Sequence, residues 1–114
     1  MANPVIHFEI GGRDAPALQE FYRNLFEWEI DAENPMDYAF VNTGEGGLNG
    51  GIHQPAEQPP YITVYVQVDD VQAYLDKAEA LGGKTVLPLT SIPDVGQMAW
   101  LQDPEGNKIG LWRS

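Results

Sequence analysis

Hydrophobic and polar residues alternate along two stretches of the chain, and each stretch runs into a helical pattern. Residues 5–10 alternate between apolar and polar side chains, which is the period of a β-strand. Residues 15–26 then carry apolar side chains three and four positions apart, so they predict an amphipathic helix with Asp14 as its N-cap. Residues 61–68 and 71–81 repeat the same order. The sequence therefore predicts a duplicated strand–helix unit.

Short apolar segments separated by glycine and proline fill the rest of the chain, and they predict further strands joined by turns. We expect these strands at 28–30, 38–42, 48–53, 84–87, 97–102 and 107–112. Asn34-Pro35-Met36 predicts a turn, and residues 88–96 predict a loop. The order is βαβββ twice. This pattern predicts one α+β domain of two modules, about 1–53 and 61–114, joined by a proline-rich linker at 54–60.

Sorting the strand residues by face separates an apolar set from a mixed set. We expect the apolar set to pack against the helices: Ile6, Phe8, Ile10, Ala39, Val41, Ile62, Val64, Val66, Val68, Ala99, Leu101, Ile109 and Leu111. The mixed set combines aromatic and polar side chains, which is the usual lining of a small-molecule cavity, although a dimer interface has a similar composition. We expect the ligand-binding residues within it: His7, Glu9, Phe40, Thr63, Tyr65, Met98, Trp100 and Trp112.

The net charge of the chain excludes some classes of binding partner. Seventeen acidic and six basic residues give a formal net charge of -11. Such a surface repels nucleic-acid phosphates and anionic lipids, so we expect neither partner. It attracts a cationic ligand, although negative charge also serves solubility alone. The absence of cysteine excludes thiolate chemistry, and the absence of a long apolar run or a secretory signal makes a cytoplasmic location the expectation.

Three local sequence motifs occur in addition to the duplicated strand–helix pattern. They are His7 in the first strand, Phe21-Tyr22 followed by Leu25-Phe26-Glu27-Trp28, and Asp103-Pro104-Glu105-Gly106-Asn107 before the last strand. Together with the duplicated βαβββ unit, they resemble the vicinal oxygen chelate superfamily, the group of glyoxalase I, extradiol dioxygenases, and bleomycin- and fosfomycin-resistance proteins. The resemblance covers nearly the whole chain. It implies tandem βαβββ modules whose curved mixed sheets enclose a cleft, with the helices outside.

The resemblance also implies four metal-ligand positions in metal-dependent members, in the first and last strands of each module. His7 matches the first position. The other three are occupied by residues that lack the expected ligand: Thr63, Gly110 and, in the stretch Asn49-Gly50-Gly51-Ile52, Gly51. A divalent metal needs several converging donors, so His7 alone does not hold one, although Glu9 or His53 could assist. We therefore expect no metal and no other cofactor.

Two functions remain open at this point. The first is a metal-free binding protein like the bleomycin-resistance proteins, a homodimer whose aromatic-lined cleft holds a small molecule through Glu9, Tyr65, Trp100 and Trp112. The alternative is a metal-dependent lyase or dioxygenase of the glyoxalase type that uses His7. The catalytic candidates are then His7 and Glu9, since the first titrates near neutrality. The sequence favours binding and does not name the ligand.

Overall fold

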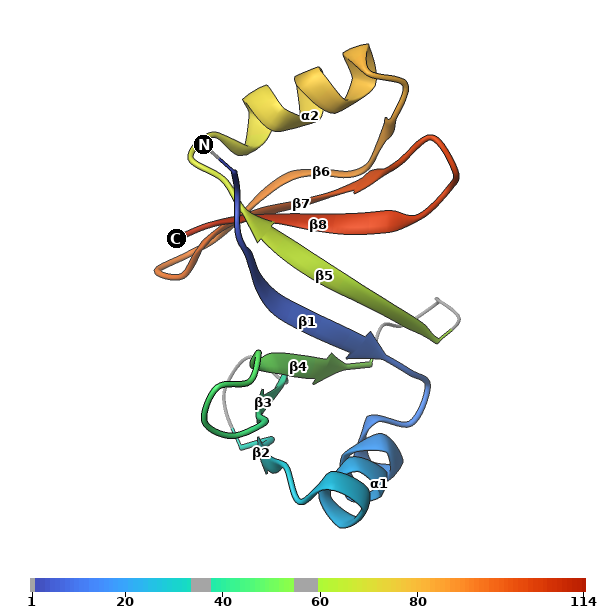
Figure 1. The fold of residues 1–114 in the computed structure, drawn as a ribbon, viewed down its shortest axis with the longest axis vertical. Coiled ribbons are helices and arrows are strands. Elements are labelled where there is room, and N and C mark those ends of the chain that lie inside the picture. The colour runs from blue at the N-terminus through green and yellow to red at the C-terminus, as the bar shows by residue number, and fades with distance from the viewer. Residues whose placement is uncertain (1, 34–37, 55–59) are drawn as a thin grey trace. The chain divides into compact units, whose positions relative to one another are not determined.

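A computed structural model describes residues 2–33, 38–54 and 60–114, which contain eight strands and two helices (Figure 1). The order βαβββ occurs twice, so the α+β class is confirmed. The elements are β1 (Val5–Gly11), α1 (Ala15–Phe26), β2 (Glu29–Asp31), β3 (Ala39–Asn42), β4 (Gly50–His53), β5 (Tyr61–Gln67), α2 (Val71–Ala80), β6 (Lys84–Ile92), β7 (Gly96–Gln102) and β8 (Lys108–Arg113). The turn expected at 34–36 and residues 55–59 of the expected linker lie outside the described residues.

The chain divides into two compact units. The N-terminal module is His7–Thr63, and the C-terminal module is residues 1–6 together with 64–114. In the N-terminal module the strand order is β2-β3-β4-β1, with β1 parallel to β4 and the other pairs antiparallel. In the C-terminal module the order is β5-β8-β7-β6, with β5 parallel to β8. Each module is therefore a mixed four-stranded arrangement with one helix.

Both helices begin where their capping residues predict. The Asp14 carboxylate accepts from the backbone N–H of Ala17 at 3.1 Å, and the Asp70 carboxylate accepts from that of Ala73 at 3.0 Å. These bonds satisfy N–H groups that have no partner within the helix. The prediction for α1 is confirmed at both ends, and α2 ends at Ala80, one residue before the predicted end. Neither of these two helices, which are those of the described residues, is long and apolar enough to cross a membrane.

Each module buries its own apolar core between its helix and its strands. The two buried clusters are Ile10, Ala15, Ala39, Val41 and Ile52 in the N-terminal module and Val68, Val71, Leu75, Ala99 and Leu111 in the C-terminal module. The expected apolar face is thus confirmed at most of the strand positions in these clusters. It is wrong at Ile62, whose side chain is 74% exposed, because the buried side chains of β5 are those of the alternate residues Thr63 and Tyr65.

The largest difference from the predicted lengths is in β6, since the bounds of the other strands differ from the prediction by one or two residues. Residues 88–96 were expected to form a loop because of Pro88, but β6 continues through it to Ile92 and the chain turns only before Gly96. β6 pairs with β7 alone and lies at the edge of its module, and its register shifts between Leu87 and Thr90. A proline without an N–H is tolerated at an edge strand and at a bulge. The expectation of a loop is therefore wrong for residues 88–92.

Two leucines, Leu75 within α2 and Leu81 at its C-cap, test the role of the core of the C-terminal module. Leu75 is 1% exposed, whereas Leu81 is 72% exposed. We expect Leu75→Ala to lower the free energy of unfolding by about 2–5 kcal/mol, because it leaves a cavity in a packed core. The matched change Leu81→Ala should alter it by less than about 0.5 kcal/mol. Urea denaturation of both variants measures the difference, and equal losses would contradict the packing described here.

Candidate functional site

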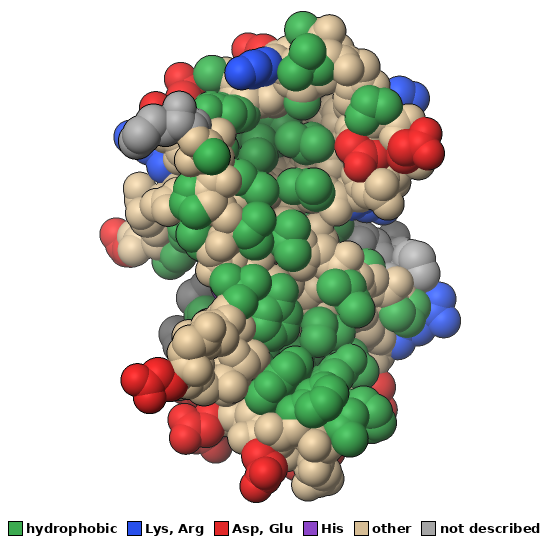
Figure 2. Space-filling model, in the orientation of Figure 1, with side chains coloured by type: hydrophobic (Ala, Val, Ile, Leu, Met, Phe, Trp, Pro, Cys, Tyr) green, Lys and Arg blue, Asp and Glu red, His purple; other side chains and the backbone are tan. Residues whose placement is uncertain are grey.

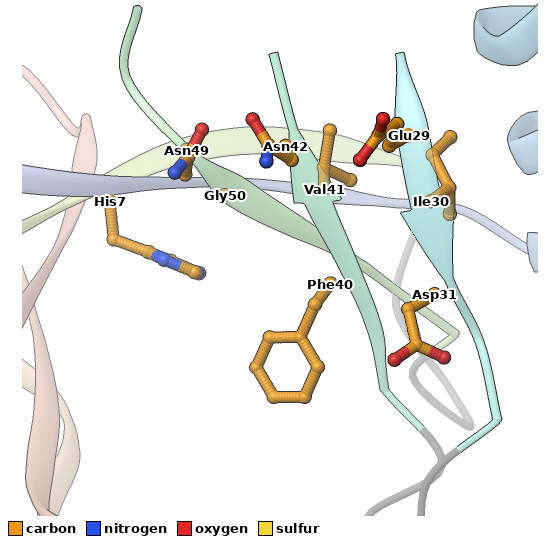
Figure 3. Close-up of a pocket in the computed structure, with 9 residues that line it drawn as sticks. All are labelled: His7, Glu29, Ile30, Asp31, Phe40, Val41, Asn42, Asn49 and Gly50. Carbon is orange, nitrogen blue, oxygen red and sulfur yellow. The ribbon is translucent and has the colours of Figure 1, made fainter. Parts of the chain in front are cut away.

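A pocket of about 460 Å³ lies on the strands of the N-terminal module (Figure 3). Two residues expected in a ligand site, His7 on β1 and Phe40 on β3, project into it from the same side of the strands. The described residues that line it are His7, Glu29, Ile30, Asp31, Phe40, Val41, Asn42, Asn49 and Gly50. None of these is Lys or Arg. We call this space the His7 pocket.

The register of β2 and β3 explains the acidic side of the His7 pocket. Asp31 pairs with Phe40 and Glu29 pairs with Asn42, and residues two apart on a strand share a face. The two carboxylates therefore lie on the same face of the sheet as Phe40, with Asp31 beside Phe40 and Glu29 beside Asn42. Asn42 and Asn49 use their amide oxygens to accept from backbone N–H groups of residues 43–44 at 2.9–3.1 Å, which holds both amides at the pocket edge.

Sequence reasoning missed several residues of this pocket. It assigned neither carboxylate of β2 to a site, because a three-residue strand is too short to show an alternating pattern. The signal that was available is the spacing of the two carboxylates, since Glu29 lies within the expected strand 28–30 and Asp31 follows two positions later. Asn42 belongs to the mixed face but was not singled out, and Asn49 precedes the strand in which it was expected to lie.

A second group of polar side chains links His7 to Glu9. Glu9 is only 5% exposed, and its two carboxylate oxygens accept from the hydroxyls of Tyr38 at 2.9 Å and Tyr61 at 2.5 Å. The Nε2 atom of His7 lies 2.8 Å from the Tyr38 hydroxyl oxygen. We call these four residues the Glu9 network. His7 and Glu9 are thus brought together as expected from their shared strand face, but through Tyr38 rather than directly.

Glycines make room for the two tyrosine rings of the Glu9 network. A Cβ atom at Gly51 would overlap the Tyr38 ring and its hydroxyl, and one at Gly11 would overlap the Tyr61 ring. Both glycines have negative φ, so backbone conformation is not the reason for them. Each ring therefore lies directly against a strand backbone, and this contact aims its hydroxyl at Glu9.

The other expected ligand residues lie in different surroundings. Thr63 is buried in the N-terminal module, at 5% exposure. Tyr65 and Trp100 are buried in the C-terminal module, where the Trp100 Nε1–H donates to the Tyr65 hydroxyl at 2.7 Å. Met98 and Trp112 form a cross-strand pair of partly buried residues on β7 and β8. The expectation that all of them contact a ligand stays a prediction.

The residues at the metal-ligand positions do not fit a metal held by several donors. Gly51 lies under Tyr38, and Gly110 lies under the Tyr65 ring in the same way, so no carboxylate fits at either position unless a ring moves. Among the described residues, no three His, Asp or Glu side chains form a group that could hold an ion. The ring of His53 lies 5.9 Å from that of Tyr38, and its Nδ1 is buried without a hydrogen-bond partner among the described residues. His53 does not complete a ligand set.

The protonation of His7 follows from its surroundings. Burial lowers the pKa of His7 below its usual 6.5, because desolvation disfavours the charged imidazole, and the nearby Glu9 carboxylate raises the pKa in part. Desolvation is the larger effect. His7 is therefore neutral at physiological pH.

A titration of the imidazole signals by NMR tests this description of His7. We expect a His7 pKa below 6.5 in the wild type and a still lower one in Glu9→Gln, since that change removes the charge that raises it. Between the lowered pKa and 6.5 the unfolded chain binds a proton that the folded chain does not, so stability falls as the pH drops through this window. His7→Asn should reduce that slope in urea denaturation between about pH 7.5 and 5. A measured His7 pKa above 6.5 would contradict the conclusion that desolvation is the larger effect on this imidazole.

Comparison with solved structures supports the fold. The methylmalonyl-CoA epimerase of Mycobacterium tuberculosis superposes with a TM-score of 0.69 at 16% sequence identity, over 95% of this chain and 85% of that one. A glyoxalase/bleomycin resistance protein/dioxygenase superfamily member from Vibrio splendidus superposes with a TM-score of 0.66 at 16% identity, over 99% of this chain and 100% of that one. At this level of identity the likeness concerns the fold alone.

Sequence comparison identifies the family. The protein named "Putative glyoxylase CFP32" of Mycobacterium tuberculosis is 34% identical over 110 residues, which cover 89% of this chain and 42% of that protein. The "Anthracycline biosynthesis protein DnrV" of Streptomyces peucetius is 25% identical over 124 residues, covering 93% and 45%. The chain thus spans less than half the length of these two relatives. The family model for the Glyoxalase/Bleomycin resistance protein/Dioxygenase superfamily matches residues 5–111, so the resemblance inferred from the sequence is confirmed and the chain belongs to this superfamily.

Proposed function

We propose that this protein binds a cationic, aromatic small molecule in the His7 pocket and does so without a metal. The observation that carries the proposal is the pair of carboxylates that β2 places in the pocket, Asp31 opposite Phe40 and Glu29 opposite Asn42, with no Lys or Arg among the described lining residues. A carboxylate attracts the cationic group of a ligand, and an aromatic ring contacts either its apolar part or the cation itself. An acidic pocket with one exposed ring matches such a ligand.

The charge and protonation of the surroundings support this proposal. The net charge of -11 raises the local concentration of cations near the protein. Burial keeps His7 neutral by lowering its pKa, so the imidazole does not repel a bound cation. The volume of about 460 Å³ lies within the range of small-molecule pockets.

The alternative is a metal-dependent lyase or dioxygenase that uses His7. It draws on the names of relatives and structural neighbours, among them a glyoxylase and an epimerase. Such chemistry needs a metal with several protein ligands. Tyrosine rings cover the glycines at two of the expected ligand positions, and the third holds Thr63. Binding without a metal is therefore the function that we propose.

A homodimer is part of the proposal, since it follows from the likeness to drug-binding members of the superfamily. Figure 2 shows hydrophobic side chains gathered on the surface around α1. Phe21, Leu25 and Phe26 are each more than half exposed there. A cavity of about 750 Å³ lies beside the same helix, next to the exposed Ile62. Exposed apolar surface of this kind is typical of a protein interface.

A series of phenethyl compounds tests the charge preference of the His7 pocket. We expect phenethylammonium to bind more tightly than the neutral 2-phenylethanol, and phenylacetate to bind least, because only the first complements Glu29 and Asp31. Calorimetry gives the dissociation constants, and NMR shifts of the Phe40 and Asn42 amides locate the ligand. The double variant Glu29→Gln/Asp31→Asn should weaken phenethylammonium binding by about two- to fivefold, as expected for exposed charges.

The matched control for that series is Asp69→Asn/Glu105→Gln, which also removes two acidic charges, from exposed positions in the C-terminal module. It should leave the affinity for phenethylammonium unchanged at moderate ionic strength, since screening weakens distant charges. An equal loss of affinity in both variants would mean that the net charge alone attracts the ligand. Equal binding of all three compounds would refute a cation site.

A titration with metal ions tests the metal-free part of the proposal. We expect chelator-treated protein to bind Zn²⁺, Ni²⁺, Mn²⁺ or Fe²⁺ no more tightly than about millimolar in calorimetry, because the described part of the chain holds no group of three His, Asp or Glu side chains that could bind an ion. His7→Ala should leave these isotherms unchanged. Stoichiometric binding at about micromolar affinity that is lost in His7→Ala would favour the enzyme instead.

A further inference from the structure

The Glu9 network joins a residue of the His7 pocket to a buried carboxylate through side-chain contacts. Two tyrosine hydroxyls meet one buried carboxylate, and one of them also meets the imidazole of His7. His7 lines the His7 pocket, whereas the buried Glu9 does not appear among its lining residues. The chain of contacts therefore runs from a pocket residue to a carboxylate behind it.

Counting hydrogens along this chain fixes the direction of each bond. A tyrosine hydroxyl has a single hydrogen, and a carboxylate only accepts. The hydroxyls of Tyr38 and Tyr61 both donate to Glu9, so the Tyr38 oxygen has only lone pairs left for His7. The 2.8 Å contact between that oxygen and Nε2 of His7 is then a hydrogen bond only if Nε2 carries the hydrogen. Neutral His7 is consequently the Nε2–H tautomer, with Nδ1 unprotonated.

Packing holds Tyr38 in the orientation that this bond needs. Its ring lies against Gly51, where a Cβ atom would collide with it, and its edge meets the Phe40 ring with centroids 5.3 Å apart. The rings of His7 and Tyr38 are nearly parallel, with an interplanar angle of 24° and centroids 6.2 Å apart. The ring contacts therefore fix the position of the Tyr38 hydroxyl oxygen near Glu9 and His7, whereas the direction of its hydrogen depends on which acceptor is present.

We propose that Glu9 is a positioning residue that acts through the Tyr38 hydroxyl to hold His7 as a single tautomer, with Nε2 protonated and its ring fixed at the pocket. Without the Glu9 acceptor, the Tyr38 hydrogen is able to turn toward Nε2 of His7, and the Nδ1–H tautomer becomes populated. Glu9 thus determines which hydrogen-bonding groups His7 offers, although it does not touch the ligand. That His7 faces a ligand rests on the proposed function, whereas the tautomer does not.

The first experiment reads the tautomer directly. Protein with ¹⁵N-labelled imidazoles is studied by long-range ¹H–¹⁵N NMR at about pH 7.5, where His7 is neutral. We expect the Nε2–H signature in the wild type and a mixture of tautomers in Tyr38→Phe. Tyr61→Phe is the matched control, because it also removes one hydroxyl from Glu9 but leaves the bond between Tyr38 and Glu9 in place. It should keep the Nε2–H signature.

Glu9 itself is tested by Glu9→Leu, which keeps an apolar side chain of similar size in the buried position. We expect this variant to populate the Nδ1–H tautomer of His7, with an otherwise folded amide spectrum. The proposal is overturned by a dominant Nδ1–H tautomer in the wild type or by equal shifts in Tyr38→Phe and Tyr61→Phe. An unchanged tautomer in folded Glu9→Leu overturns it as well. The wild type and the two tyrosine variants decide the question if Glu9→Leu does not fold.

The second experiment asks whether the tautomer matters for binding. With phenethylammonium as the probe, Tyr38→Phe should raise the dissociation constant by about three- to tenfold, the effect of losing one oriented hydrogen bond. Tyr74→Phe in the C-terminal module, whose hydroxyl accepts from Asn3, serves as the control and should leave the affinity unchanged. If phenethylammonium does not bind the wild type, the proposed function fails while the NMR result still decides the tautomer. A tautomer shift without any change in affinity would overturn the role of Glu9 in binding.

Discussion

The buried carboxylate of Glu9 sets the conditions that the rest of the N-terminal module has to meet. A carboxylate removed from water is strongly unfavourable unless hydrogen bonds replace its hydration. The hydroxyls of Tyr38 and Tyr61 supply one bond to each oxygen, and bonds to a charged group contribute about 1.5–3 kcal/mol each. Removal of either hydroxyl leaves one oxygen with fewer donors inside the module. The two tyrosines and the carboxylate are therefore one structural unit.

The two tyrosines of that unit explain why glycine occupies two strand positions whose backbone conformation does not require it. Gly11 and Gly51 lie in regular strands, and each is needed because a tyrosine ring occupies the space of its side chain. The C-terminal module repeats the device without a carboxylate, since Tyr65 lies on Gly110 and accepts from Trp100 instead. A tyrosine over a strand glycine thus occurs in both halves of the duplicated chain. The polar partner of the hydroxyl is what differs between them.

Much of the fold could be predicted from the sequence because it depends on neighbouring residues. Helix α1 has a capping aspartate and a periodic apolar face, and both of its ends were found. The length of β6 could not be predicted, because it depends on an edge position that tolerates Pro88. Likewise, Ile62 belongs to an alternating apolar run, yet the buried residues of its strand are Thr63 and Tyr65 on the other face. These errors arise where the surrounding module, not the local pattern, decides the outcome.

The candidate site could be predicted only in part, for a similar reason. His7 and Phe40 follow from the alternation of their strands. The link between His7 and Glu9 does not, because it depends on Tyr38, which lies 29 positions from Glu9 and reaches it across a strand. The acidic side of the pocket depends on a register between β2 and β3 that no local pattern encodes. Side-chain hydrogen bonds between distant segments need the folded structure.

The seating of Tyr38 on Gly51 also limits how this chain can change over evolutionary time. An acidic residue at position 51 collides with the ring while Tyr38 is present, and removal of Tyr38 first takes a donor from the buried Glu9. Each substitution is harmful on the background of the other original residue, so the effect of one depends on the presence of the second. The present pair, Tyr38 with Gly51, is therefore separated from a chain with an acidic residue at position 51 and no Tyr38 by single variants of lower stability. A lineage that has placed a tyrosine here is therefore held to this arrangement, because a change at either position first gives a less stable protein.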